Sequence, residues 1–228
     1  MRKSKTIVSA NEEDSFTTSL SDLMAGLLGL FILALCFFML NFQRVTSQYA
    51  GNLQTRSSML RDVERNMMNH GVQIYIDSKQ GVLRIPESVL FESGHADIKP
   101  EGRQAIQQLS QILYGELTKP EYKNAVETVF IEGHTDNVPI QNQYFQSNWE
   151  LSTQRAINTW NLMRFDVVGL NTLVNANGVP IFSCSGYADT RPVKDDAFDE
   201  NSVEGRQANR RIDIRFVMMP PKDSNAER

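Results

Sequence analysis

Residues 20–42 read LSDLMAGLLGLFILALCFFMLNF. Within this stretch, residues 23–40 carry no charged side chain. At ~1.5 Å per residue, such a run with its flanks crosses a hydrocarbon core of roughly 30 Å as one helix. We therefore predict a transmembrane helix over residues 16–42, with a short segment on one side of the membrane and the remaining chain on the other.

One ionisable side chain, Asp22, lies at the start of this run, next to Ser21. A carboxylate just inside a membrane helix costs free energy and by default marks an ion pathway or a polar contact between helices. The alternative is that Asp22 only begins the helix as its N-cap, a position that aspartate and serine both favour. Position alone does not separate the two interpretations.

The apolar run is interpreted as an uncleaved anchor. It is longer than the apolar part of a signal peptide, acidic residues at 12–14 precede it, and no A-x-A cleavage pattern comes after it. A lipoprotein signal is the alternative, because residues 33–36 (LALC) resemble a lipobox. The residue before Cys36 is the large Leu35, however, and Cys36 lies deep in the run, so the anchor is favoured.

Basic residues set the expected orientation of the helix. Arg2, Lys3 and Lys5 precede it, whereas Arg44 is the only basic residue close behind it. The positive-inside rule counts basic residues near the ends of a membrane helix. It places the N-terminus in the cytoplasm and the chain after residue 42 on the other side of the membrane.

Composition limits the class of protein. The chain has 228 residues and a net charge of −4, so it offers one ordinary soluble domain with a connector and no general basic surface for nucleic acid. Cys36 and Cys184 would lie in different environments, which argues against an intramolecular disulfide and a Cys/His metal cluster. No phosphate-binding glycine loop or nucleophile elbow is present, so we expect no enzyme, no cofactor and no metal.

Two short segments flank the membrane helix and the main domain. Residues 1–15 are polar and too short to fold alone, and are predicted to be a disordered cytoplasmic tail. Residues 43–71 are predicted to be an interrupted amphipathic helix, broken at Gly51. Its apolar stripe is interpreted as packing on a second copy in a tether, with a short plugging helix as the alternative. That stripe comprises Val45, Tyr49, Leu53, Met59, Val63 and Met67.

Residues 72–218 predict an α+β domain, in which two main helices pack on a mixed sheet of about four strands. Alternation and a turn at residues 79–81 predict a hairpin, Pro100 opens a helix, and residues 219–228 form a loose polar tail. The predicted strands cover residues 72–77, 82–85, 128–132, 181–187 and 211–217, and the predicted helices cover 100–113, 148–165 and 202–209.

The strongest chemical signal is a pair of segments, IEGHTD at 131–136 and NWELSTQRA at 148–156. If the loop between them folds back, Asp136 and Arg155 face one cleft with opposite charges. Such a cleft suits a zwitterion, because the carboxylate takes an ammonium and the guanidinium takes a carboxylate in bidentate fashion. The alternative is an internal Asp136–Arg155 ion pair that only fixes the loop.

Four motifs in order, GHTD, NWELSxxRA, SGYADTRP and NRRIDI, resemble the OmpA C-terminal family of peptidoglycan-binding domains. The resemblance covers about residues 72–218. It implies that Asp136 and Arg155 grip the diaminopimelate of the wall peptide. It also implies that Thr135, Asn148, Leu151 and Arg210 line the same site. The loop between Asp136 and Asn148 is longer than in the shortest members of that family.

The membrane end resembles a second family. Residues 21–25, SDLMA, are similar to the start of the membrane helix in MotB-type stator subunits, which continue into an OmpA-like wall anchor. The resemblance implies that Asp22 carries a proton or sodium ion. It further implies an inner-membrane homodimer inside a ring of A subunits of the MotA or ZorA type, with five A to two B, bound to peptidoglycan and not to nucleic acid.

The short cytoplasmic tail and the sequence SLSDLM are most similar to the B subunits (ZorB) of Zorya anti-phage defence systems. A proton-driven motor subunit in defence is therefore the expected function. A flagellar MotB-type stator subunit is one alternative. A passive OmpA-like tether between membrane and wall is the other, and it does not need Asp22.

Other candidate sites are weaker. His70, His95 and His134 lack metal-ligand spacing and are interpreted as surface or loop histidines. The acidic stretch 189–200 lacks the glycine register of a calcium loop and is interpreted as a solvated loop. The remaining arginines near the C-terminus, Arg206, Arg211 and Arg215, are interpreted as framework of the domain.

Overall fold

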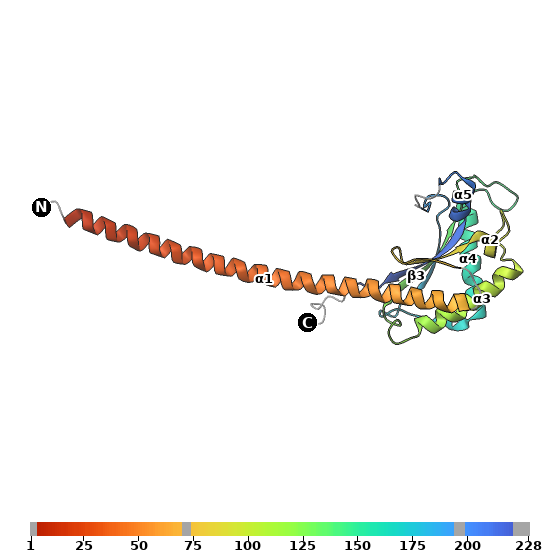
Figure 1. Cartoon of the computed structure of the whole chain (residues 1–228), viewed down its shortest axis with the longest axis horizontal. Helices are drawn as coiled ribbons and strands as arrows, with labels where there is room; N and C mark the ends of the chain where they lie inside the picture. The colour runs from red at the N-terminus through yellow and green to blue at the C-terminus, as the bar shows by residue number, and fades with distance from the viewer. Residues whose placement is uncertain (1–3, 70–73, 194–198, 221–228) are drawn as a thin grey trace. The chain divides into compact units, whose positions relative to one another are not determined.

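The computed structural model of the chain describes residues 4–69, 74–193 and 199–220 (Figure 1). Its contacts divide the chain into two compact units, Met1–Tyr49 and Ala50–Arg228. The first unit consists of most of helix α1 (Ser4–Asn69). The second contains the end of that helix and all other elements.

Helix α1 carries the predicted membrane span. Within the described ranges, it is the one helix that is long and apolar enough to cross a membrane, by length and composition. Its apolar side chains point outward: Leu33 is 71% exposed and Phe42 is 74% exposed. Such a surface is stable in lipid or against other apolar helices, and not in water.

Helix α1 begins much earlier than the sequence suggested. It starts at Ser4, so the disordered tail predicted for residues 1–15 is wrong for the described part of that segment. Asp22 and Ser21 therefore lie inside the helix, and the N-cap interpretation of Asp22 is also wrong. The Ser21 hydroxyl donates to the main-chain oxygen of Thr17 at 2.8 Å, a bond that forms within a helix.

The predicted break at Gly51 is absent as well, because α1 continues through it to Asn69. A glycine inside a helix costs about 1 kcal/mol, whereas one fully buried large apolar side chain contributes about 1.5–3 kcal/mol. Four residues of this segment are 1% exposed or less and belong to the core of the second unit: Met59, Leu60, Val63 and Met67. The later part of the apolar stripe thus packs on the chain's own domain.

The boundary of the domain shifts accordingly. Residues 50–69 belong to the compact unit, although the sequence placed its start at residue 72. Val72 itself lies outside the described residues. The helical segment is also held by polar contacts: Asn52 Nδ2 donates to the oxygen of Met219 at 2.6 Å, and Tyr122 Oη donates to Asp62 Oδ2 at 3.0 Å.

The sheet has five strands in the order β1-β2-β5-β3-β4, where about four were expected, and each of the five predicted strand segments contributes one. The strands β3 and β4 are parallel and all other neighbours are antiparallel, so the predicted mixed sheet and α+β class are confirmed. The predicted β1–β2 hairpin is also confirmed, with Gly81 at φ 71° in its turn. The strands are β1 (Tyr75–Asp77), β2 (Val82–Pro86), β3 (Val126–His134), β4 (Phe182–Gly186) and β5 (Arg211–Met218).

The helices of the domain follow their sequence signals. Pro100 occupies the first turn of α3 (Pro100–Leu117), and the Ser147 side chain caps α4 (Asn148–Asp166). The short α5 (Val203–Asn209) is also confirmed. Two elements were not predicted, because each is too short to show a period: α2 (Glu87–Leu90) and the 3₁₀ helix η1 (Val168–Thr172).

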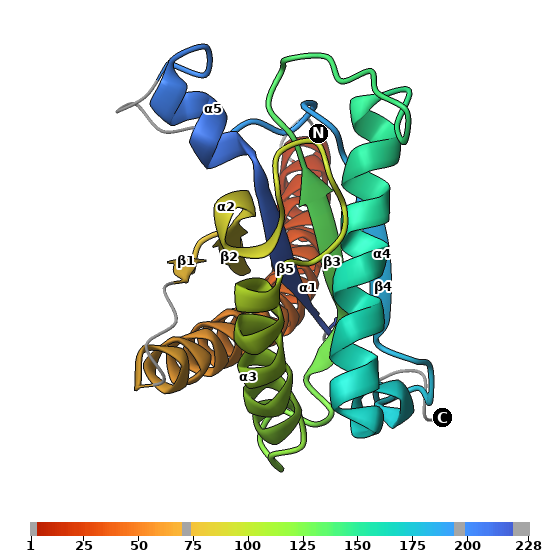
Figure 2. The ribbon, with the colours of Figure 1, turned by 90° about the vertical axis from the view of Figure 1, so that its right-hand side faces the viewer.

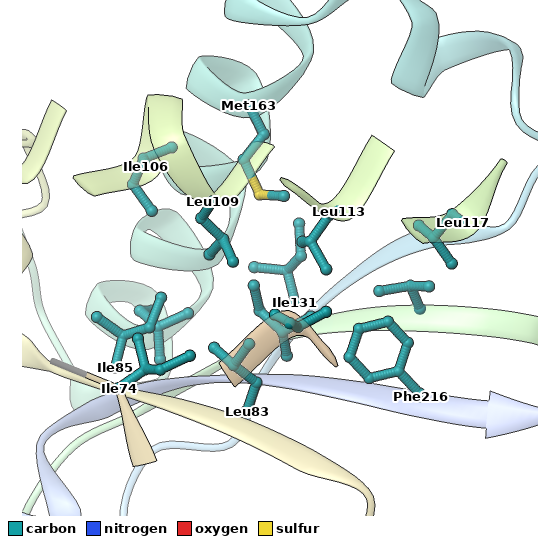
Figure 3. Close-up of a cluster of buried hydrophobic side chains, with 14 of the residues drawn as sticks. Ile74, Leu83, Ile85, Ile106, Leu109, Leu113, Leu117, Ile131, Met163 and Phe216 are labelled. Carbon is teal, nitrogen blue, oxygen red and sulfur yellow. The ribbon is translucent and has the colours of Figure 1, made fainter. Parts of the chain in front are cut away.

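Helices α3 and α4 lie side by side on one face of the sheet (Figure 2). The hydrophobic core lies between these two helices and the sheet. In Figure 3, Ile106, Leu109 and Leu113 of α3 point toward the sheet, where they meet Ile131 and Phe216. All five side chains are fully buried, so this layer joins α3 to β3 and β5 and fixes the edge at which the candidate site lies.

Candidate functional site

The end of β3 is held beside α4 by a short chain of hydrogen bonds. The main-chain nitrogen of Thr135 donates to the oxygen of Ala188 at 2.9 Å. The nitrogen of Ala188 in turn donates to the hydroxyl oxygen of Ser152 in α4, at 3.1 Å. Ala188 has a φ of 49°, the only described residue other than glycine with a positive φ. This local geometry places Thr135 and Asp136 next to the first turns of α4.

The Asp136 carboxylate has two partners. Its Oδ1 accepts from the main-chain nitrogen of Val138 at 3.1 Å, and its Oδ2 accepts from Arg210 Nη1 at 2.6 Å. The side chain is 13% exposed. Thr135 Oγ1 donates to the main-chain oxygen of Asp136 at 2.9 Å, so both the backbone and the carboxylate of Asp136 are held in place.

Asn148 closes the loop that joins β3 to α4. Its Nδ2 donates to the main-chain oxygens of Asp136 and Val138, at 3.3 and 3.0 Å. The loop therefore folds back as the sequence required, despite its length. Ser147, immediately before, accepts from the nitrogen of Glu150 at 3.3 Å and caps the helix. The cap fixes the direction in which α4 presents Asn148 and Arg155.

Arg155 is a buried cation, 2% exposed. Its Nε donates to the oxygen of His95 at 2.8 Å, and its Nη2 donates to Glu87 Oε1 and to the oxygen of Glu92. The Phe91 ring lies 5.0 Å from its guanidinium. Burial lowers the pKa of Arg155 below its usual value, and the Glu87 carboxylate opposes that shift.

The predicted alternative, an internal Asp136–Arg155 ion pair, is wrong. Asp136 pairs with Arg210, and Arg155 pairs with Glu87. Arg210 also contacts Glu87, at 2.8 Å between Nε and Oε2. The four side chains form one line, Asp136–Arg210–Glu87–Arg155, in which carboxylates and guanidiniums alternate. The arrangement is more elaborate than a single pair because both arginines share one carboxylate.

All six residues proposed for ligand binding line one pocket of about 330 Å³. The pocket is mixed in character: the charged line forms one part, and apolar side chains from the β3–α4 loop form another. The six are Thr135, Asp136, Asn148, Leu151, Arg155 and Arg210, and the sequence did not predict the other lining residues, Glu87, Ser93, Gly94, Val138, Pro139, Ile140 and Arg206.

Glu87 is the most important of the residues that sequence reasoning missed. It is the first residue of α2, directly after Pro86 at the end of β2, and its side chain is 8% exposed. Proline followed by an acidic residue is a helix-start signal that marks α2 itself. Nothing in the local pattern indicates that the carboxylate reaches Arg155, 68 residues further along the chain.

A second charged cluster lies on strands β3 and β5. The predicted surface or loop position of His134 is wrong: it is a strand residue, 1% exposed, and its ring stacks on Tyr187 at 5.5 Å. Its Nε2 is 3.8 Å from Glu132 Oε2 and 3.6 Å from Asp213 Oδ2. Burial lowers the pKa of His134, Arg211 adds to the shift, and the two carboxylates oppose it.

Glu132, His134 and Asp213 are close enough together to hold a metal ion. Their chemistry does not favour one. Both Glu132 oxygens accept from Arg215, and both Asp213 oxygens accept from Arg84 or Arg211. Three guanidiniums thus already neutralise two carboxylates, and a divalent cation would have to displace them. The cluster is an ion network that joins β2, β5 and β3.

Several other sequence expectations fall partly outside the described residues. His70 lies there, and so do Asp195 and Asp196 of the acidic stretch 189–200. The tail predicted over residues 219–228 is described only as far as Pro220. Asp22 is described, but it belongs to the first unit and not to the pocket.

The sequence model of the OmpA family matches residues 90–206, which is just over half of the chain. The chain belongs to the OmpA family. The match runs from the end of α2 into α5 and so includes five of the six predicted binding residues. Membership agrees with the resemblance that the four motifs indicated.

Among curated proteins, Motility protein B of Bacillus subtilis is 29% identical over 170 residues, or 75% of this chain. This chain spans 58% of the length of that relative. Two solved structures show the fold: a putative MotB-like protein from Desulfovibrio vulgaris, and the cell wall anchor of the T6SS from Pseudomonas aeruginosa. The first has 23% identity and a TM-score of 0.51, and the match covers 77% of this chain and 95% of that protein's chain. The second has 24% identity and a TM-score of 0.50, covering 71% and 97%.

Proposed function

We propose that this chain is the B subunit of an ion-driven motor in a bacterial inner membrane, anchored to peptidoglycan by its OmpA domain. Asp22 carries the ion, a proton in the expected case. The N-terminus is cytoplasmic, and residues after 42 are periplasmic. The chain works as a homodimer with a multi-helix A subunit of the MotA or ZorA type, in a ratio of five A to two B.

The observation that carries the proposal is the position of Asp22 inside helix α1. The helix begins at Ser4, so Asp22 has no capping role to explain its presence. It is followed by an apolar, outward-facing surface suited to lipid or to neighbouring helices. A carboxylate maintained there at a cost in free energy is a functional group by default. Gain and loss of a proton would change which partner it prefers, and so drive stepwise movement.

The pocket supports the anchoring half of the proposal. An ammonium of the wall peptide forms an ion pair with Asp136, whose carboxylate oxygens can each accept a second hydrogen bond. A carboxyl group of the same diamino acid faces Arg155 and Arg210. Thr135 and Asn148 hold the backbone of Asp136 and the loop in place, and Leu151 packs against the apolar part of the ligand. Similarity to Motility protein B over 75% of the chain supports the combination of both halves in one type of protein.

Two biological settings for such a motor rest on different observations. The residues SLSDLM around Asp22 favour a Zorya-type anti-phage complex. The similarity to Motility protein B favours a flagellar stator subunit as the second candidate. A passive tether would use the same pocket and would leave the membrane carboxylate without a role.

The test is the substitution Asp22→Asn in cells that also express the neighbouring A subunit. Asparagine keeps the size and much of the hydrogen bonding but cannot gain or lose a proton. The variant should insert and co-purify with the A subunit, and should lose phage protection or motility. Asp22→Glu, which still titrates, should retain intermediate activity.

Ser21→Ala is the matched control. It removes a neighbouring polar group whose bond to Thr17 stays within the helix, so activity should be unchanged. Full activity of Asp22→Asn in an assembled complex would exclude ion transport by this residue and leave the passive tether.

A further inference from the structure

Both arginines of the pocket are paired before any ligand arrives. Glu87 Oε1 accepts from Arg155, and Glu87 Oε2 accepts from Arg210 at 2.8 Å. One buried carboxylate therefore occupies, on two guanidiniums, the kind of position that a ligand carboxylate would take. The sequence prediction of a bidentate grip by Arg155 assumed that its donors were unoccupied.

Few donors of Arg155 remain for a ligand. Its Nε proton goes to His95, and Nη2 donates to Glu87 and Glu92. Nη1 makes no hydrogen bond with any residue that the structure describes. A bidentate carboxylate needs two parallel N–H groups from one guanidinium. A ligand carboxylate at Arg155 can therefore receive hydrogen bonds from Nη1 alone.

The charges of these side chains also weaken the attraction of a ligand carboxylate to Arg155. Glu87 and Asp136 are negative, and Arg155 and Arg210 are positive, so the line of four is neutral without a ligand. A carboxylate entering beside Arg155 meets a guanidinium whose charge Glu87 already balances. An ammonium entering beside Asp136 meets a carboxylate held by Arg210, whose side chain is 35% exposed, against 2% for Arg155.

We propose that Glu87 sets the ligand specificity of this pocket, a proposal that rests on the proposed wall binding. By pairing with both arginines it leaves them few donors for a ligand carboxylate and makes the ammonium of the diamino acid the main recognition group. The pocket then accepts wall peptides whose terminal diaminopimelate carboxyl is amidated about as well as those in which it is free. The ligand class is a diamino acid with either a carboxylate or a carboxamide beside its ammonium.

The geometry fixes Glu87 in this role. Its main-chain nitrogen donates to the oxygen of Arg210 at 2.9 Å, so backbone and side chain hold the same residue. Pro86 before it and α2 after it restrict the backbone further. The backbone of Glu87 is thus fixed, and its carboxylate turns away only if both ion pairs, with Arg155 and Arg210, break.

The experiment measures the binding of two soluble muropeptides to the full-length protein in detergent, by calorimetry. One carries free diaminopimelate and the other its amide. The wild type should bind the two with affinities within about threefold. In Glu87→Gln, Arg155 loses its charged partner and Arg210 keeps only Asp136, so the ligand carboxylate takes the place of Glu87. The preference for the free form should then rise to about tenfold or more.

Glu92→Gln is the matched control. It removes the same charge from an exposed side chain nearby, and only the main-chain oxygen of Glu92 contacts Arg155. Its ratio of affinities should equal that of the wild type. Arg206, a third guanidinium at the pocket, is present in all three proteins, so the change in ratio isolates Glu87.

Either of two results would overturn the proposal: a wild type that binds the amide more than about threefold more weakly, or a Glu87→Gln protein with an unchanged ratio. A ratio between two ligands is not moved by a simple loss of folded protein. If Glu87→Gln does not fold, the wild-type ratio alone decides. A wild type that binds neither muropeptide refutes wall binding itself, which is a different outcome.

Discussion

Gly133 of β3 lies against the backbone of Ser152 in α4, so closely that a Cβ on Gly133 would come within 1.9 Å of the Ser152 carbonyl oxygen. No side chain fits in that space, because carbon and oxygen atoms repel each other well before this distance. The contact lets α4 approach the end of β3 and brings Asp136 to the first turns of the helix. The pocket depends on this approach.

Gly133→Ala should destabilise the protein by at least about 2 kcal/mol, because the helix must shift away from the strand. Urea denaturation followed by circular dichroism measures the effect. Gly115→Ala is the control: Gly115 is exposed on α3 with nothing within 4 Å of an added Cβ. That change should be neutral or stabilise by roughly 0.5–1 kcal/mol. Equal effects at the two glycines would contradict the packing described.

Met59→Ala should cost about 2–5 kcal/mol, because Met59 of α1 is fully buried in the core of the second unit. Met68→Ala, on the same helix but 61% exposed, should change stability by about 0.5 kcal/mol or less. For the same reason a fragment of residues 72–218 should be much less stable than one beginning at residue 50. A fragment 72–218 as stable as the longer one would show that α1 adds nothing to the core.

Asp136→Asn should abolish sedimentation of the full-length protein with purified peptidoglycan. Asparagine is isosteric but gives up the charge that attracts an ammonium, and losing one partner of a buried charge pair costs about 2–5 kcal/mol. Asp97→Asn is the matched control, since Asp97 is exposed and does not line this pocket. A correctly folded Asp136→Asn protein that still sediments would refute the assignment of the site.

Stability should fall on the acid side of neutrality because of His134. Its pKa is lowered in the folded protein by burial, whereas in the unfolded chain it titrates near its ordinary value of about 6.5. Below that pH the unfolded state binds a proton that the folded state does not. Stability is therefore complete above about pH 6.5 and declines as the pH falls toward the folded pKa, by up to about 1.4 kcal/mol per pH unit.

The comparison of wild type and His134→Asn, unfolded in urea at pH 7.5 and 5.5, isolates this effect. The variant should lose the decline between the two pH values. His95→Asn, which changes an exposed histidine, should keep it. At lower pH the protein also loses stability through Glu132. Burial raises the pKa of Glu132, but His134 and Arg215 outweigh burial and hold that pKa below its usual value. Its contribution is present above about pH 4.5 and is lost as the pH falls further.

Local sequence patterns predict much of the fold, and there are physical reasons why they do not predict the rest. Pro100 and the cap at Ser147 mark the starts of α3 and α4, and the turn at Gly81 marks the hairpin. The N-terminal part of helix α1 was missed because its residues are polar. Such a segment becomes helical as a continuation of the apolar helix that follows it. Its apolar stripe after Gly51 fits a dimer or a core equally well, since a period says nothing about the partner.

The sequence could predict which residues belong to the site, but not which charged side chains pair with one another. Motif order brought Asp136, Asn148 and Arg155 into one place, and they line one pocket. Which charges meet depends on distances across the chain that no local spacing encodes. Glu87 reaches Arg155 and Arg210 only because β2 and β5 are neighbours, which carries α2 to the start of β5.

The ion network on the sheet has a consequence for how the domain opens. Arg84 of β2 neutralises Asp213 of β5, and Arg215 of β5 neutralises Glu132 of β3. If β3 peeled away from β5, Glu132 would lose Arg215, at a cost beyond the lost backbone hydrogen bonds, whereas Asp213 would keep Arg211 of its own strand if β2 left. Strands β3 and β5 therefore separate only together. Their amide hydrogens should exchange with solvent through a single shared event, at the free energy of global unfolding, while the edge strand β1 exchanges earlier.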